Sequence, residues 1–273
     1  MSTKLPIMEI FGPTIQGEGI MAGRITHFVR TGGCSLRCAW CDEMRSVHPE
    51  SVQAFATWMT PEEVADAVGE LSPASWVTLT GGDPCIHEKL DVVVRMLNAQ
   101  GRSIAVETQG MHFPEWLSSC DSVTFSPKGP GSGNPMDVSA LCDWLKWMHT
   151  AYELCIKIVI NTYDEQVMAD DFQYAVETFN KIRQTTSAGI TYYISAMTPQ
   201  GLKQRKIADA VLESYRRMVE YLLQLQREVS STLTGATEEL GIGELDHGTN
   251  IINHIRTCCQ QHVLLWPGEN VGR

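Results

Sequence analysis

Strand-like and helix-like segments alternate along most of this chain, and that alternation restricts the fold more than any other feature. Residues 154–160 form a near-continuous apolar run, which is typical of a strand buried on both faces. Repeated strand–helix units predict an α/β fold with a parallel sheet and right-handed crossovers. The other strand patterns lie at 25–30, 76–80, 103–107, 122–125, 190–194 and 263–265, and the helix patterns at 60–71, 90–99, 141–148, 164–182 and 203–229.

The number of these units indicates how the sheet closes. About six or seven can be identified, fewer than the eight of a closed barrel. We therefore expect a partial, TIM-like parallel β/α barrel, although a doubly wound sheet has the same periodicity. The length of 273 residues fits a single domain over 1–273. Residues 231–250 are polar and contain four glycines, so we expect an insertion or a mobile loop there.

Charge and hydropathy exclude several functional classes. The formal net charge is −11 and the sequence pI is about 5.2, which argues against a broad nucleic-acid-binding surface. No apolar run reaches the roughly 18 residues that a membrane span requires. Residues 1–6 lack the apolar stretch of a secretory signal. We therefore expect a cytoplasmic protein without nucleic-acid or membrane partners.

Three of the nine cysteines fall within eight residues. Cys34, Cys38 and Cys41 form a C-x3-C-x2-C pattern in a loop that follows the strand at 25–30. Clustered cysteines in a cytosolic chain indicate metal or redox chemistry more often than disulfides. Three thiolates on a [4Fe-4S] cluster leave one iron open, and an open iron can bind a substrate or cofactor directly.

A zinc knuckle is the simpler alternative for the same cysteines. Zinc usually takes four ligands in two separated pairs, and this segment supplies three in one short loop. The fourth ligand would have to come from His48, Cys85 or His87.

The cysteine spacing, the preceding strand and the aromatic Trp40 before the third cysteine resemble the signature of the radical S-adenosylmethionine (SAM) superfamily. The resemblance implies that the open iron chelates the amino and carboxylate groups of SAM. It also implies that the reduced cluster cleaves SAM to methionine and a 5′-deoxyadenosyl radical. The cofactors carry this chemistry, while the protein positions and shields them.

Further sequence blocks narrow the resemblance. Taken together, they resemble the 7-carboxy-7-deazaguanine synthase (QueE) family from about Glu9 to Trp266, least of all in 231–250. Members of that family are lyases that convert 6-carboxy-5,6,7,8-tetrahydropterin to 7-carboxy-7-deazaguanine with loss of ammonia. They use a [4Fe-4S] cluster, SAM and Mg²⁺, and their product feeds queuosine in tRNA or deazaguanines in DNA. The blocks are residues 9–19, 28–30, 80–87, 106–110, 125–128 and 260–266.

The resemblance implies a substrate site. A pterin has a guanidine-like edge of N–H donors, which Gln16 and Glu18 can pair with, and Arg30 offers a planar fork for the substrate carboxylate. A solvated turn and a surface arginine are the simpler interpretations of the same residues. The expected substrate-binding set is Ile15, Gln16, Gly17, Glu18, Arg30, Thr80, His262 and Arg273.

A second set is expected to hold SAM. A Gly-Gly pair at a strand end lets the backbone approach a ligand closely, although such a pair is usually only a turn. By resemblance, Ser126 and Lys128 hold the ribose or carboxylate of SAM, and Glu107 contacts the ribose hydroxyls. The expected set is Ala39, Trp40, Asp42, Gly82, Asp83, Glu107, Gln109, Ser126, Pro127 and Lys128. Lys157 lies inside an apolar strand and requires a partner if it is buried.

The chain departs from the family pattern at three places. Glu43 stands where the family usually has a Thr or Ser hydroxyl bound to Mg²⁺. Either Glu43 binds the ion directly or it turns toward Arg45; we favour direct coordination, because a carboxylate is a good Mg²⁺ ligand and costly when unpaired. Asp83 replaces a usual glutamate. The chain also continues to Arg273, and some relatives place their terminal carboxylate at the substrate.

Two other functions stay open on the sequence alone. One is a different radical SAM enzyme, such as a glycyl-radical activase, and the other is a non-catalytic iron–sulfur or zinc protein. Gln16, Glu18 and Arg30 argue for the synthase over an activase, and Ser126 and Lys128 argue against a non-catalytic carrier. The resemblance also implies a homodimer and an electron donor such as flavodoxin or ferredoxin.

Overall fold

A single sheet organises the molecule. The computed structural model describes residues 4–147, 153–198, 204–240 and 251–261. Within them, nine strands follow the order β3-β1-β2-β4-β5-β6-β7-β8-β9. They are β1 (Leu5–Ile15), β2 (Ile25–Thr31), β3 (Thr57–Met59), β4 (Trp76–Gly81), β5 (Ser103–Thr108), β6 (Ser122–Phe125), β7 (Glu153–Ile160), β8 (Ile190–Ala196) and β9 (Ile255–Cys258).

The pairing of these strands confirms the expected open α/β barrel. Each pair from β2–β4 through to β8–β9 is parallel, while β1 runs antiparallel to both β2 and β3. The ends of the strand order, β3 and β9, are not neighbours, so the sheet does not close.

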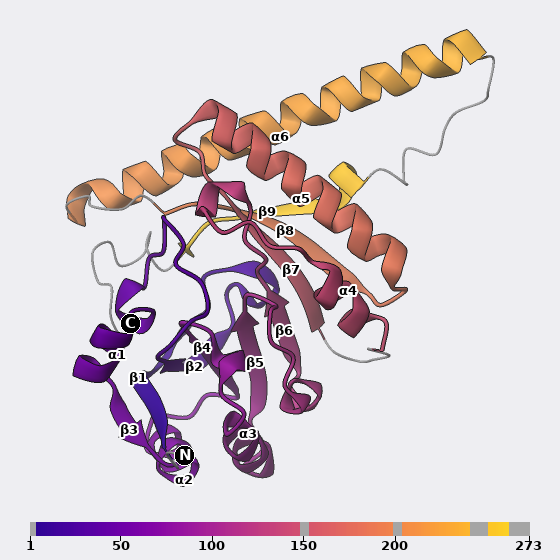
Figure 1. Cartoon of the computed structure of the whole chain (residues 1–273). Coiled ribbons are helices and arrows are strands. Elements are labelled where there is room, and N and C mark those ends of the chain that lie inside the picture. Colours follow the sequence, from indigo (N-terminus) through magenta and orange to yellow (C-terminus); the bar gives the residue numbers. More distant parts are fainter. Residues whose placement is uncertain (1–3, 148–152, 199–203, 241–250, 262–273) are drawn as a thin grey trace.

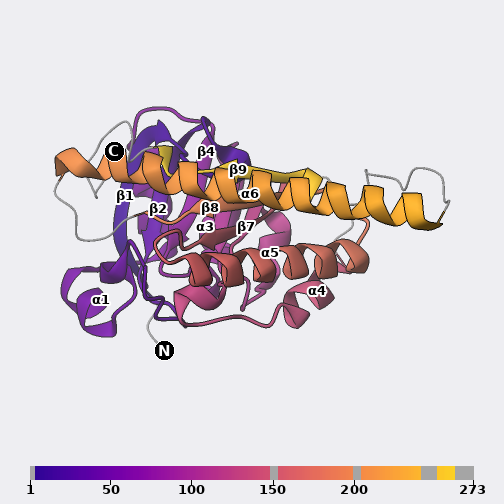
Figure 2. The same cartoon turned by 90° about the horizontal axis from the view of Figure 1, so that it is seen from above.

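Helices cover the outside of the curved sheet (Figures 1 and 2). Thr60 and Glu63 form a capping box at the start of α2, which fixes where that helix begins, as expected for a helix over 60–71. The long helix α6 crosses over the last strands and extends past the sheet at its C-terminal end in both views. The helices are α1 (Pro49–Phe55), α2 (Pro61–Gly69), α3 (Leu90–Ala99), α4 (Ser139–Leu145), α5 (Glu165–Thr185) and α6 (Gln204–Leu240).

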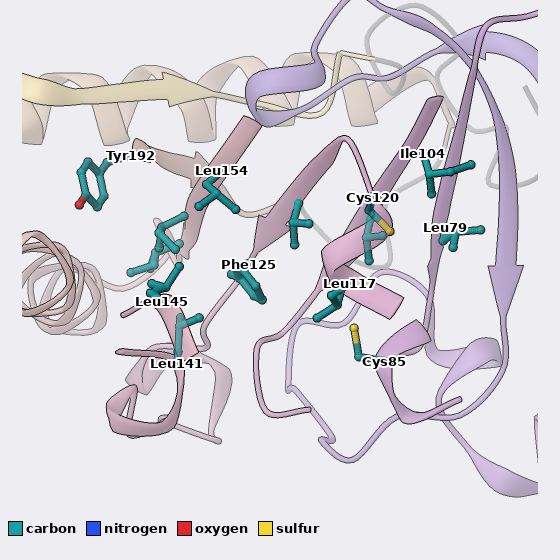
Figure 3. Packing of buried hydrophobic residues seen from close by; sticks show 14 of the residues in the cluster. Leu79, Cys85, Ile104, Leu117, Cys120, Phe125, Leu141, Leu145, Leu154 and Tyr192 are labelled. Carbon is teal, nitrogen blue, oxygen red and sulfur yellow. The ribbon is translucent and has the colours of Figure 1, made fainter. Parts of the chain in front are cut away.

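The core lies between the sheet and these helices. Leu79, Phe125 and Leu154 from three strands are buried together with Leu117 and Leu141 from the flanking segments (Figure 3). A fully buried side chain of this size stabilises the fold by roughly 1.5–3 kcal/mol relative to an exposed one. Among the described residues, no helix combines the length and apolar character that crossing a membrane requires.

Several elements differ from the sequence expectations. Strands β1, β3 and β9 and helix α1 were not expected. Strand β1 contains Pro6, Gly12 and Pro13, which are residue types typical of loops. Helix α6 continues to Leu240 rather than ending near 229, so the first half of the loop expected at 231–250 is helical. One glycine, Gly235, costs a long helix only about 1 kcal/mol. The rest of that loop, and the strand expected at 263–265, lie outside the described residues.

Parallel strands place the functional loops together. The C-terminal ends of β2, β4, β5 and β6 meet at one edge of the sheet, where ligands of such folds bind. The segments that follow these ends are residues 32–43, 82–83, 109–110 and 126–128.

Candidate active site

The cysteine loop after β2 is tied to its surroundings by backbone hydrogen bonds. Gly33 N donates to Ser46 O at 2.6 Å, and Ala39 N donates to Ser132 O at 2.8 Å. Ser132 belongs to the Gly- and Pro-rich loop after β6. The two loops therefore pack against each other.

The three cysteines of this loop are free thiols in a partly buried setting. Burial raises the pKa of Cys34 and of Cys38, and burial together with the charge of Asp42 raises the pKa of Cys41 to about 11. The positive charge of Lys128 opposes each of these shifts. Binding to iron requires thiolates, so cluster assembly would release the thiol protons.

Orphaned polar atoms next to this loop fit a polar cofactor. Trp40 Nε1, Asp83 Oδ2 and Gln109 Nε2 are buried without a hydrogen-bond partner in the described residues. Such groups cost free energy unless a ligand satisfies them. Gln109 also lies at the cysteines, with its Oε1 at 3.8 Å from Cys34 Sγ. The chemistry of this donor set matches SAM beside an iron–sulfur cluster.

The described side chains form no ready-made site for a single metal ion. In the described part of the chain, no three His, Cys, Asp or Glu side chains converge as ligands of one metal ion. A zinc site needs its ligands about 2.0–2.3 Å from one centre. In a [4Fe-4S] cluster, by contrast, each thiolate binds its own iron. Cys34, Cys38 and Cys41 would hold such a cluster.

Most of the residues expected to bind SAM surround the cysteine loop. Lys128 Nζ lies 5.4 Å from the centre of the Trp40 ring and donates to Ser126 Oγ at 3.0 Å. A Cβ on Gly82 would lie only 2.1 Å from Gly33 O, so this close approach requires glycine. The expected residues Ala39 and Pro127 lie within the cysteine loop and the loop after β6, respectively.

Asp83, which stands where a glutamate is usual, is fully buried. Its Oδ1 accepts hydrogen bonds from Thr108 Oγ1 at 2.7 Å and from Cys85 N at 3.2 Å. Burial raises the pKa of the Asp83 carboxyl, although these bonds and the nearby Gln109 amide oppose the shift. The shorter side chain is thus held in place, and its second oxygen makes no hydrogen bond within the described residues.

A buried polar network links the expected substrate and cofactor residues. Lys157 Nζ donates to Glu18 Oε2 and lies 3.7 Å from Glu107 Oε1. Thr80 Oγ1 donates to Glu107 Oε2 at 3.2 Å. The sequence placed Glu18 at the substrate and Glu107 at SAM, and the fold brings both to one lysine. Lys157 lines the inside of the barrel and is not at an edge.

Gln16 stabilises the turn that carries Glu18. The Gln16 side chain is buried, and its Oε1 accepts a hydrogen bond from Gly17 N at 2.7 Å. Gln261 N donates to Gly17 O at 3.3 Å, so the segment after β9 contacts this turn. Ile15 ends β1 directly before it.

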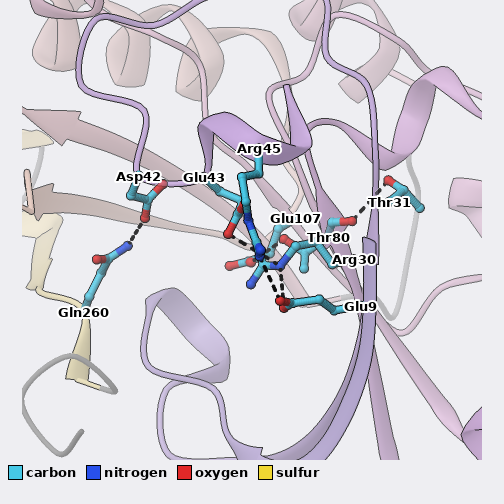
Figure 4. A network of polar contacts seen from close by, with 9 residues as sticks. All are labelled: Glu9, Arg30, Thr31, Asp42, Glu43, Arg45, Thr80, Glu107 and Gln260. Atoms are coloured by element: carbon cyan, nitrogen blue, oxygen red, sulfur yellow. Dashed lines mark hydrogen bonds and ion pairs between the residues drawn. The ribbon is translucent and has the colours of Figure 1, made fainter. Parts of the chain in front are cut away.

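Four charged side chains, Glu9, Arg30, Glu43 and Arg45, form a ring of ion pairs (Figure 4). Arg30 Nε lies 3.3 Å from Glu9 Oε2 and 4.0 Å from Glu43 Oε2. Arg45 lies 3.1 Å from Glu9 Oε1 through Nη2 and 3.6 Å from Glu43 Oε1 through Nε. Each carboxylate oxygen of the pair therefore faces a guanidinium group.

This ring bears on the expected magnesium ligand. A divalent cation at Glu43 would have to displace a guanidinium group or lie beside two of them, and guanidinium stays charged. The contacts of Glu43 therefore do not fit a magnesium ion and favour the alternative in which Glu43 turns toward Arg45.

Other residues at the site were missed or lie outside the described part. Asp42 accepts a hydrogen bond from Gln260 at 2.6 Å (Figure 4), and Gln260 in turn contacts Thr198. Glu9, Arg45, Thr198 and Gln260 carry no local sequence signal for these contacts. The expected residues His262 and Arg273 lie outside the described residues.

Known proteins share these features. Residues 28–125 match the Radical SAM superfamily. The chain is 36% identical over 177 residues to the 7-carboxy-7-deazaguanine synthase of Bacillus cereus, covering 64% of this chain and 71% of the relative. It is 40% identical over 134 residues to the Bacillus subtilis synthase, covering 48% of this chain and 55% of the relative.

The fold comparison agrees. The crystal structure of QueE from Escherichia coli matches with a TM-score of 0.53 at 24% identity, over 71% of this chain and 84% of that chain. This likeness concerns the fold, and the B. cereus synthase supplies the sequence relationship. The cysteine loop, the open barrel and this relationship establish that the chain belongs to the 7-carboxy-7-deazaguanine synthase family of radical SAM enzymes.

Proposed function

We propose that this chain is a radical SAM lyase that converts 6-carboxy-5,6,7,8-tetrahydropterin to 7-carboxy-7-deazaguanine with loss of ammonia. The relatives bear that synthase name. The observation that carries the proposal is the buried network in which Lys157 joins Glu18 to Glu107, at the same strand end that brings Gln109 to Cys34 of the cysteine loop. Neither a glycyl-radical activase nor a non-catalytic iron–sulfur protein is favoured by any described contact.

The side chains suit a carboxylated pterin. Glu18 is a carboxylate acceptor for the N–H donors of the pterin edge, and Lys157 and Glu107 link it to Thr80. Arg30 makes its two ion pairs through Nε, and we expect its terminal amino groups to bind the substrate carboxylate as a fork. On the cofactor side, Trp40, Asp83 and Lys128 orient SAM and exclude water. The cluster and SAM, when bound, supply the one-electron chemistry of the reaction.

Further properties follow from the family and belong to the same proposal. We infer a homodimer, a cytoplasmic location, and a small electron donor such as flavodoxin or ferredoxin. The product would enter queuosine or related 7-deazapurine biosynthesis. Magnesium stays a prediction of the resemblance alone, and the ion pairs of Glu43 oppose it.

One assay tests the proposal against its alternatives. The protein is purified without oxygen, its iron is measured, and it is incubated with SAM, dithionite and the carboxypterin. We expect about four irons per chain and mass-spectrometric detection of 7-carboxy-7-deazaguanine. SAM cleavage that leaves the pterin unconsumed would identify a different radical SAM enzyme. A colourless, iron-free protein would remove the radical SAM assignment altogether.

A further inference from the structure

Lys157 is a charged residue in the most apolar strand of the sheet. It lies in β7, between Ile156 and Ile158, both fully buried, and only 7% of Lys157 is exposed. A charged side chain buried in such a place destabilises the fold unless it is paired with an opposite charge. Lys157 contacts two carboxylates from distant parts of the chain, Glu18 before η1 (Gly19–Met21) and Glu107 in β5.

The two carboxylates share one ammonium group. Because the same Nζ reaches Glu18 Oε2 and Glu107 Oε1, both acids lie in one mostly buried space, with side chains 10% and 26% exposed. Like charges this close disfavour each other's ionised form when no cation lies between them. Burial alone would lower the pKa of Lys157, but the charges of Glu18 and Glu107 outweigh it and raise that pKa above its ordinary value.

The other titratable groups near Lys157 do not supply the positive charge that the two carboxylates need between them. Burial raises the pKa of Cys155 to about 12 and also raises that of Cys258, so both thiols are neutral near pH 7. Burial and the neighbouring charge of Lys157 lower the pKa of Lys128, and its Nζ contacts Ser126 and lies over Trp40 beside the cysteines. Among the described residues, the titratable groups that interact with Lys157 are Glu18, Glu107, Lys128, Cys155 and Cys258.

We propose that Lys157 is a positioning residue that allows Glu18 and Glu107 to be ionised side by side, and so keeps Glu18 as the acceptor for the pterin N–H edge. The inference rests on the proposed function, since it names the pterin as the ligand of Glu18. A carboxylate has about four acceptor positions, so Glu18 can bind Lys157 and the pterin together. Lys157 thereby couples the residue assigned to the substrate with the one assigned to SAM.

The test measures equilibrium binding of the carboxypterin to the iron-loaded protein without SAM, so that no turnover occurs. In Lys157→Met, one of the two acids takes up a proton, and we expect pterin affinity at pH 7 to fall about tenfold or more. The ratio of the variant Kd to the wild-type Kd should shrink as pH rises from about 6 to 9, since Glu18 regains its charge. Using the ratio cancels titration of the pterin itself.

A second variant distinguishes this role from a purely structural one. Adding Glu107→Gln to Lys157→Met removes the competing carboxylate, so pterin affinity should return to within about threefold of wild type and lose its pH dependence. Lys181→Met, at an exposed lysine on α5 paired with Asp137, is the matched control and should bind as wild type does. Thermal unfolding checks that each variant is folded.

The outcomes separate the inference from the proposed function. A wild-type protein that fails to bind the carboxypterin contradicts the function. Normal wild-type binding with an unchanged, pH-independent Kd in Lys157→Met overturns the inference alone. If Lys157→Met does not fold, the double variant decides, because it carries one unpaired carboxylate fewer. A folded double variant that binds no pterin also overturns the inference.

Discussion

The carboxylate of Asp171 accepts a hydrogen bond from the backbone N–H of Gly131, with 2.8 Å between Oδ1 and N. Its other oxygen accepts from Asn161 N at 2.9 Å, and the side chain is fully buried in α5. Gly131 lies in η5 (Pro130–Ser132), and Ser132 O binds Ala39 N in the cysteine loop. Asp171 is therefore two contacts away from the expected cluster ligands.

Replacing Asp171 with Ala should weaken both the fold and the cluster. Two partly buried N–H groups lose their acceptor, at about 1 kcal/mol each, and the loop that supports Ala39 is released. We expect a lower free energy of unfolding in urea and faster loss of iron to a chelator. Asp170→Asn on the same helix is the control and should change neither quantity. If stability falls but iron retention is unchanged, the loop that contains Gly131 does not support the cysteine loop.

Replacement of Cys34, Cys38 or Cys41 with Ala should each abolish the cluster and all SAM cleavage. Each thiolate is expected to bind one iron, so no remaining group substitutes for it. Iron content, the visible absorption of the reconstituted protein and methionine release measure the effect. Cys120→Ala is the control, since that thiol is buried in the hydrophobic core. Full iron and activity in any of the three variants would show that the ligand assignment is wrong.

Arg30→Ala should weaken carboxypterin binding far more than SAM binding. A charge-assisted fork in a desolvated site contributes on the order of 2 kcal/mol, or about thirtyfold in Kd. Arg30→Lys keeps the charge next to Glu9 and Glu43 but loses the fork, so it should recover only part of the affinity. Arg24→Ala, which breaks the pair with Glu153 on another part of the sheet, should leave both Kd values unchanged. Equal losses for both ligands would give Arg30 a structural role.

The ring around Glu43 predicts that activity does not depend on magnesium. Removal of divalent cations should change the rate less than about twofold, because Glu43 is already paired with Arg30 and Arg45. The double variant Glu43→Thr with Arg45→Ala removes one charge of each sign and opens the position, so it should acquire a Mg²⁺ requirement. Mn²⁺ binding followed by electron paramagnetic resonance gives a readout independent of activity. If the wild-type enzyme loses activity on chelation and regains it with Mg²⁺, this prediction is wrong and direct coordination by Glu43 becomes the better interpretation.

Stability should fall in mild acid because of His87. Burial lowers the pKa of His87 below its ordinary value of 6.5, and its Nε2 lies 2.8 Å from Gly32 O beside the cysteine loop. The unfolded chain then binds the proton more readily than the folded one. Stability is therefore lost as pH falls below about 6.5, at up to about 1.4 kcal/mol per pH unit. Burial shifts the pKa of His27 in the same direction, so it adds to the slope.

Urea unfolding at pH 7.5, 6.5 and 5.5 measures this slope. His87→Gln keeps a side-chain N–H donor that can reach Gly32 O but does not titrate, so it should flatten the dependence without abolishing it. The His27 contribution then remains. An identical slope in wild type and variant would show that His87 has the same pKa in the folded and unfolded chains.

The sequence by itself determined the features that depend on local spacing. The C-x3-C-x2-C pattern identified the cysteine loop, and the capping box of Thr60 and Glu63 fixed the start of α2. The alternation of apolar segments predicted the open parallel barrel. Parallel strands are buried on both faces, so each one is visible as a short apolar run in the sequence.

Only the tertiary structure decided which charged groups meet. Lys157 contacts Glu18, 139 residues away, and Glu43 is paired with guanidinium groups rather than exposed to a metal ion. These contacts depend on strand order and register, which bring distant loops to one edge of the sheet. A short stretch of sequence does not contain both partners of such a contact and therefore cannot predict it. Strand β1 was hidden for a related reason: its prolines and glycine break the local pattern, but pairing with β2 and β3 holds the strand together.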